Sequence, residues 1–264
     1  MTVAGRRLSV ITPTCNRPVA LDLTRRWMAA QTLQPDEWII IDGADARATH
    51  PPGALNFLDN LERGVAAATG DRLIFWEDDD FYDPRHLEQM IAQWDLHPDA
   101  CLIGDPTQRY YNISYRRYRV MANRGASLCQ TGMSAALRPW FATVLATCRA
   151  LVTAPAYGLD TRLWAPALAG GYPHVLAPFD TVVGIKGIPG QQGLGMGHQP
   201  ARVAANSWTA DPQLRTLTAW VGPEHAQMYV HLAGSIIATA PAARIIRPPR
   251  STPATLRRTS HGPA

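Results

Sequence analysis

Short apolar runs alternate with segments of helical spacing along the first hundred residues. The runs are apolar throughout rather than alternating, which is typical of strands buried on both faces of a parallel sheet. Strands are predicted at 8–12, 37–41 and 72–76, and helices at 19–32, 56–69 and 84–94. This order predicts an α/β fold, with a doubly wound, mostly parallel sheet and helices on both faces.

The second half of the chain has a less regular pattern. We predict a strand at 101–104, a hairpin at 110–121, and helices at 139–150, 211–220 and 223–234. Glycines are dense between 184 and 197, which indicates a mobile loop; they stand at 184, 187, 190, 193, 195 and 197. Pro, Ser, Thr and Arg dominate from Arg247 onward. We therefore expect one domain over 1–246 and a disordered basic tail over 247–264.

Composition narrows the class of protein only moderately. Of the 264 residues, 46% are hydrophobic and 17% are charged, as expected for a folded domain. The formal net charge of +4 permits an anionic partner such as nucleic acid, a nucleotide or an acidic membrane surface, and it is equally compatible with simple solubility.

Features of membrane and secreted proteins are absent from the sequence pattern. No apolar run reaches the ~20 residues of a spanning helix, and Met1 to Arg7 leads into a strand without a secretory signal. The cysteines have neither metal-ligand nor disulfide spacing; they are Cys15, Cys101, Cys129 and Cys148. We expect a cytoplasmic protein, in the host cytoplasm if it is viral.

Four consecutive carboxylates, Glu77 to Asp80, follow the third predicted strand directly. Clustered like charges are costly unless a positive group lies among them, and a divalent cation with oxygen ligands is a common neutraliser that also binds phosphates. Ligands of open α/β sheets bind beyond the carboxyl ends of the strands, where Thr12, Pro13 and Asp42 are also expected. The pattern predicts a metal–diphosphate site, the alternative being a solvated acidic turn.

Several segments, in this order, resemble the inverting glycosyltransferases of family 2, which have the GT-A fold. They are Val10–Arg17, Ile39–Gly43, Gly64–Asp71, Leu73–Asp80 with Pro84 and Leu87, Thr131–Arg138 and Tyr157–Trp164, so the resemblance covers about residues 7 to 165. It implies a donor half near 7–100 and an acceptor half near 101–246. Two motifs depart from the family, because Glu62-Arg63-Gly64 replaces Asn-x-Gly and Leu159-Asp160 replaces the Glu-Asp pair.

The resemblance also implies roles for individual residues. Asp79, Asp80 and His198 would hold Mn²⁺ or Mg²⁺, although both Asp78-x-Asp80 and Glu77-x-Asp79 fit the metal motif. Asp160 would be the catalytic base, unless it only caps a helix. The nucleotide sugar would be bound by Thr12, Pro13, Arg17, Asp42, Asp78 and Lys186. Asp42 as a strand-end cap, and His198 as an ordinary structural histidine, remain open alternatives.

The acceptor is less well defined than the donor, for which a UDP-sugar is expected. Family 2 enzymes commonly act on glycans or lipid-linked sugars, whereas a small basic enzyme could glycosylate hydroxymethylated bases in double-stranded DNA. Segment 109–124 mixes tyrosines with arginines and could stack bases and contact phosphates, or be a solvated hairpin. Other classes are a nucleotidyltransferase, whose glycine-rich loop is missing after the first strand, and a non-catalytic nucleic-acid-binding module.

Overall fold

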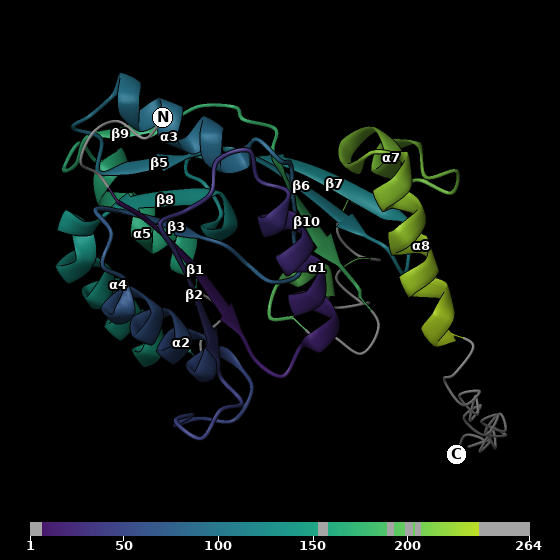
Figure 1. Ribbon diagram of the computed structural model, residues 1–264, viewed down its shortest axis with the longest axis horizontal. Helices are drawn as coiled ribbons and strands as arrows, with labels where there is room; N and C mark the ends of the chain where they lie inside the picture. Colours follow the sequence, from purple (N-terminus) through teal and green to yellow (C-terminus); the bar gives the residue numbers. More distant parts are fainter. Residues whose placement is uncertain (1–6, 153–157, 189–192, 199–202, 204–206, 238–264) are drawn as a thin grey trace, which may run out of the picture.

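The computed structural model describes residues 7–152, 158–188, 193–198, 203 and 207–237 (Figure 1). Its larger sheet has the order β2-β1-β3-β8-β5-β9. The strands are β1 (Leu8–Thr14), β2 (Glu37–Asp42), β3 (Arg72–Phe75), β5 (Leu102–Gly104), β8 (Thr131–Ser134) and β9 (His174–Leu176). β1 is parallel to β2 and β3, while β8 runs antiparallel between β3 and β5. The predicted strands at 8–12, 37–41, 72–76 and 101–104 are therefore confirmed, with one reversed strand inserted.

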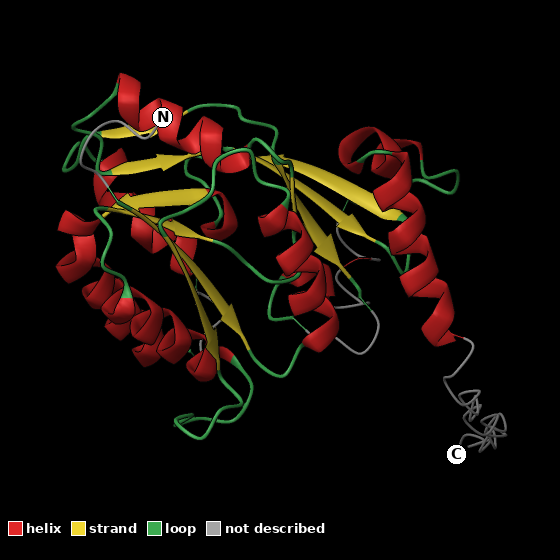
Figure 2. Ribbon diagram, viewed as in Figure 1, coloured by secondary structure: helices red, strands yellow, loops and turns green. Residues whose placement is uncertain are grey.

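Helices cover both faces of this sheet (Figure 2). α1 (Pro18–Ala29) and α3 (His86–Leu96) pack on one face, and α2 (Ala54–Ala67), α4 (Arg138–Ala150) and α5 (Leu159–Leu168) on the other. Neighbouring residues on a strand point to opposite faces. Accordingly, Val10 and Ile74 join the core under α1 and α3, while Ile11 and Phe75 join the core under α2 and α4. The expected GT-A type of α/β fold is confirmed.

A second sheet, which the sequence indicated only in part, has the order β11-β7-β6-β10-β4. Its strands are β4 (Phe81–Tyr82), β6 (Thr107–Asn112), β7 (Arg117–Ala122), β10 (Val182–Lys186) and β11 (Thr209–Ala210). β6 and β7 form the predicted hairpin. β4 follows the four carboxylates directly and pairs with β10, so the acidic segment connects the two sheets.

The prediction of a glycine-rich loop over 184–197 is wrong for its first residues, because 184–186 belong to the buried strand β10. Gly184 serves close packing there: a Cβ at this position would lie 2.4 Å from Cδ1 of Tyr110 on the paired strand. Residues 193–198 are described and end in the short 3-10 helix η3 (Met196–His198). Residues 189–192 lie outside the described part of the chain.

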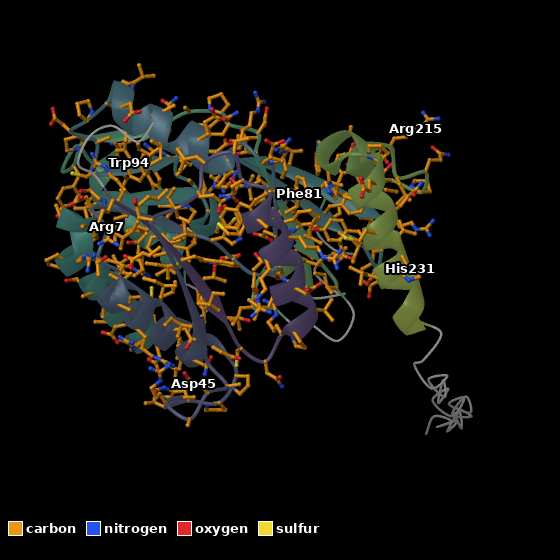
Figure 3. The ribbon with its side chains drawn as sticks, viewed as in Figure 1. Arg7, Asp45, Phe81, Trp94, Arg215 and His231 are labelled. Atoms are coloured by element: carbon orange, nitrogen blue, oxygen red, sulfur yellow. The ribbon has the colours of Figure 1, made fainter. Side chains whose placement is uncertain are left out.

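Two further helices, α7 (Arg215–Val221) and α8 (Pro223–Ile237), confirm the last predicted helical segments. Trp27 of α1 contacts the rings of Phe81 and of His225 on α8, with centroid distances of 4.9 and 4.7 Å. Phe81, labelled in Figure 3, lies in this junction. Among the described helices none is long and apolar enough to cross a bilayer. The predicted tail, 247–264, lies outside the described residues.

Candidate functional site

The acidic segment is enclosed by the structure. Trp76, which precedes it, is fully buried and stacks on Tyr82 with a centroid distance of 3.6 Å, and its Nε1 donates to Thr24. The hydroxyl of Tyr82 accepts a hydrogen bond from the amide of Glu77. Asp78, Asp79 and Asp80 expose only 2%, 5% and 1% of their surface. The alternative of a solvated acidic turn is therefore wrong.

Arg17 contributes the first positive charge to this buried cluster. It lies in the loop between β1 and α1, where its guanidinium donates to Asp78 and, over 2.8 Å, to Asp79. The hydroxyl of Thr14, the last residue of β1, donates to Asp78 over 2.6 Å. The first strand and its loop thus hold two of the carboxylates in place.

Lys186 contributes the second positive charge, from the last position of β10. Its Nζ lies 2.9 Å from Oδ1 of Asp80 and 3.7 Å from Oδ1 of Asp79. Nε2 of His198, in η3, lies 3.1 Å from Oδ2 of Asp79. Asn112 anchors this segment by donating to the carbonyl of Gly197 over 2.7 Å. The structure brings together Lys186, His198 and the acidic cluster, far apart in sequence.

Burial and neighbouring charges shift the pKa values of the four carboxyl groups in different directions. Burial works against ionisation of Asp79, but the charges of Lys186 and Arg17 prevail and hold its pKa well below the ordinary range. Burial raises the pKa of Asp78 to about 7 in spite of Arg17. The pKa of Asp80 is raised by burial, and that of Glu77 is raised by burial and by Asp80. Asp79 is thus the carboxylate most strongly held in its charged form.

Asp160, the predicted base, lies in the first turn of α5 and within electrostatic range of the cluster. The N-cap position belongs to Gly158, and no side chain caps this helix, so the structure does not support the N-cap alternative for Asp160. Burial raises the pKa of Asp160 to about 6, while a hydrogen bond from the Leu128 amide and the charge of Lys186 oppose the rise. The buried carboxyl group of Asp160 is therefore a stronger base than an ordinary aspartate.

Of the residues predicted at the ends of β1 and β2, Asp42 is partly accessible, whereas Thr12 and Pro13 are buried. Asp42 accepts hydrogen bonds from the amides of Asn16 and Ala44, as a strand-end cap does, and it remains half-buried. Pro13 is buried within β1, and the hydroxyl of Thr12 accepts from Trp38. The hydroxyl of Thr12 is thus engaged by a side chain of β2. Thr14, two residues later, contacts the cluster and was missed.

The cluster offers donor atoms of kinds that divalent cations bind. Oδ2 of Asp80 is buried, and no hydrogen bond of ordinary geometry reaches it from the described residues; Nδ1 of His198 is likewise without a partner among them. Carboxylate oxygens of Glu77 and Asp80 and the thiol of Cys129 lie within 4.8 Å of one another. Oxygen and imidazole donors suit Mn²⁺ or Mg²⁺, so the residues fit such an ion. Cys129, a lone cysteine, gave no sequence signal.

A GT-A type of fold with a buried acidic segment after its third strand is what the resemblance to family 2 glycosyltransferases predicted. The family model for glycosyl transferase family 2 matches residues 9–152. This chain belongs to glycosyl transferase family 2.

Individual relatives are more distant. The chain is 30% identical over 117 residues to the uncharacterized glycosyltransferase YwdF of Bacillus subtilis (strain 168), a match that covers 37% of this chain and 43% of YwdF. The chain thus spans less than half the length of this curated relative.

Among solved structures, a mannosyltransferase from Pyrobaculum calidifontis, PcManGT, in complex with GDP-Man and Mn²⁺, is 15% identical with a TM-score of 0.45, over 92% of this chain and 77% of that one. Glucosyl-3-phosphoglycerate synthase from Mycobacterium tuberculosis is 16% identical with a TM-score of 0.34, over 51% and 58%. TarS of S. aureus is 17% identical with a TM-score of 0.30, over 40% and 21%.

Proposed function

We propose that this protein transfers a sugar from a nucleotide diphosphate sugar to an acceptor hydroxyl, in an inverting reaction that depends on Mn²⁺ or Mg²⁺. A UDP-sugar is the first donor to test. The observation that carries the proposal is the convergence of Arg17, Lys186 and His198 on Asp79 and Asp80, beside the ends of β1 and β3.

The chain's own residues would bind the diphosphate through charge. Arg17 and Lys186 lie at the cluster, and both are available to anionic phosphate oxygens once those oxygens compete with the carboxylates. Asp79, Asp80 and His198 would hold the divalent cation. When bound, the cation supplies electrostatic stabilisation of the charge that develops on the leaving diphosphate. Asp42, beside the end of β1, would contact the base or the ribose.

Asp160 would act as the base for inversion. Its carboxylate would accept the proton of the acceptor hydroxyl while that oxygen attacks the anomeric carbon and the bond to the diphosphate breaks. The pKa of about 6 suits this role, because the group is largely ionised at neutral pH and still basic enough to accept a proton.

The packing of the hairpin formed by β6 and β7 limits which of its side chains could contact DNA. Tyr111 is fully buried and donates to Asp211, so its ring is not available to stack bases. Tyr118, against Trp220, and Tyr110, near Lys186, are half-buried. Tyr115 is 49% exposed. Of the tyrosines in the proposed DNA contact, only Tyr111 is thus withdrawn, while Arg116 is exposed and available for phosphates.

Two acceptor classes therefore remain as candidates: hydroxymethylated bases in double-stranded DNA, and glycans or lipid-linked sugars. The test offers radiolabelled UDP-glucose with Mn²⁺ and three acceptors: hydroxymethylated DNA, plain DNA and a panel of oligosaccharides. Label on modified DNA alone would establish a DNA-modifying enzyme. Label on an oligosaccharide alone would establish a glycan acceptor, and label on none of them, after the test is repeated with the other nucleotide sugars, would reject DNA and these oligosaccharides as acceptors.

A further inference from the structure

Lys186 is a positive charge built into the acidic cluster from a different part of the chain. Its side chain is 7% exposed, and Nζ contacts both Asp79 and Asp80. The neighbouring charges that raise its pKa, in spite of burial, are those of Asp79, Asp80 and Glu77. The ammonium group therefore lies among the carboxylates that the proposed function assigns to a divalent cation.

The surroundings of Lys186 hold the ammonium group in this position. β10 is paired on one side with β4 and on the other with β6. A Cβ at Gly197 would lie 2.7 Å from Cγ of Lys186, so the backbone of the η3 segment covers the lysine stem. The Tyr110 ring centroid is 5.8 Å from Nζ. A side chain enclosed on these sides has little freedom to withdraw into solvent.

The charges within the cluster are unequal. Arg17 and Lys186 supply two positive charges against the four carboxyl groups of Glu77 to Asp80. A divalent cation held by Asp79 and Asp80 would share these two carboxyl groups with the ammonium group. Like charges a few ångströms apart in a buried site repel strongly. Lys186 therefore opposes the binding of a divalent cation to the protein alone.

We propose that Lys186 competes with the divalent cation for Asp79 and Asp80, and that the diphosphate of the donor relieves this competition by accepting the ammonium group. The inference rests on the proposed nucleotide-sugar site for its second half only. It makes Lys186 a positioning residue that couples metal binding to nucleotide binding, so that the cation binds weakly without the nucleotide and tightly with it.

The competition between Lys186 and the cation is tested with Mn²⁺ alone. The concentration of free Mn²⁺ is measured by electron paramagnetic resonance while the nucleotide-free protein is titrated. Lys186→Met should bind Mn²⁺ at least about tenfold more tightly than the wild type, while Lys186→Arg, which keeps the charge, should not. Arg26→Met, which removes an exposed charge from α1, is the matched control and should leave the affinity unchanged. Where Lys186→Met does not fold, Lys186→Gln takes its place under the same criterion.

The second half is tested by repeating the titration with UDP and with GDP, after correction for Mn²⁺–nucleotide complexes in solution. The nucleotide should strengthen Mn²⁺ binding in the wild type, and this gain should shrink in Lys186→Met. Equal or weaker Mn²⁺ binding by Lys186→Met would overturn the competition, and an undiminished gain would overturn the coupling. Absence of sugar transfer in every assay would reject the proposed function and leave the Mn²⁺ result standing.

Discussion

At the residue scale, three successive carboxyl groups are almost fully buried: Asp78, Asp79 and Asp80. They are tolerated only because neighbouring residues offset their charge. Arg17 and Thr14 bind Asp78, while Lys186 binds Asp80. Removing one partner of a buried ion pair leaves an uncompensated charge, whereas the pair itself adds little to stability. The cluster therefore adds little to the stability of the fold, which agrees with the proposed role in ligand binding.

Neutralising Asp79 or Asp80 tests their role as cation ligands. Asp79→Asn and Asp80→Asn should each abolish Mn²⁺-dependent turnover and weaken Mn²⁺ binding, because a neutral amide is a poor ligand for a hard cation. Circular dichroism should show an intact fold. Asp22→Asn, exposed on α1, is the control. Near-normal activity in both site variants would refute the assignment.

Replacing Asp160 tests the catalytic base. Asp160→Asn should lower kcat by ~10²- to 10⁴-fold and leave donor binding within a few-fold of the wild type. Asp95→Asn, on the exposed side of α3, should have wild-type kinetics. Full turnover by Asp160→Asn would reject the base.

The pH profile of the wild type tests the same residue independently. Because a base must be unprotonated, kcat/KM should decrease as the pH falls through about 6, the pKa that burial gives Asp160. A profile that is flat from pH 7.5 to 5, with the fold intact, is not compatible with Asp160 as the base.

At the scale of elements, the close approach of α2 to β1 depends on a glycine. A Cβ at Gly64 would lie 2.4 Å from Cγ2 of Ile11, so Gly64→Ala should lower the free energy of unfolding by about 1–3 kcal/mol. Gly234, in α8, has no atom within 4 Å of its Cβ position, and Gly234→Ala should stabilise by about 0.5–1 kcal/mol. Urea denaturation of both variants measures the difference, and equal effects would contradict this packing.

The start of α3 gives a second prediction, on stability and pH. His86 is buried, its Nδ1 lies 2.8 Å from Oγ1 of Thr181, and burial lowers its pKa from 6.5 to about 3. Below 6.5 the unfolded chain binds a proton that the folded protein refuses, so the stabilisation present above pH 6.5 is lost as the pH falls toward 3. The loss is on the order of a few kcal/mol.

Urea denaturation at several pH values measures this loss. His86→Gln, which cannot titrate, should lack this part of the pH dependence, whereas His97→Gln, exposed at the end of α3, should retain it. An unchanged pH dependence in His86→Gln would contradict the assignment.

The elements that the sequence predicted correctly are those whose own residues decide their structure. β1, β2 and β3 are continuous apolar runs, and α1 and α2 have helical spacing and a Pro or Gly at their ends. β10 was missed because its glycine indicated a loop, although that glycine only makes room for Tyr110 on β6. Such a contact depends on a partner strand seventy residues away, which a single sequence does not show.

The same limit applies to the candidate site. The cluster at Glu77–Asp80 and its proximity to Arg17 could be predicted, because both follow neighbouring parallel strands. The contact between Lys186 and Asp80 could not, because it depends on the pairing of β10 with the two-residue strand β4. Thr14 and Cys129 have no distinguishing sequence context, and only their positions in the fold bring them to the carboxylates.

At the scale of the whole molecule, the acidic segment connects two sheets. β3 of the larger sheet precedes it, and β4 of the smaller sheet follows it. Arg17 comes from the larger sheet's side and Lys186 from the smaller sheet. A ligand bound at this junction would contact both sheets, and ligand binding should therefore raise the melting temperature of the domain.

The central claim is most directly tested by measuring nucleoside diphosphate release from a panel of nucleotide sugars, including UDP-glucose and GDP-mannose, with Mn²⁺ or with EDTA. Wild type and Asp79→Asn are compared without an added acceptor, so that slow donor hydrolysis alone suffices as the signal. We expect release from at least one donor with Mn²⁺, and none with EDTA or in Asp79→Asn. Release that is unaffected by EDTA and by Asp79→Asn, or no release from any donor, would contradict the account.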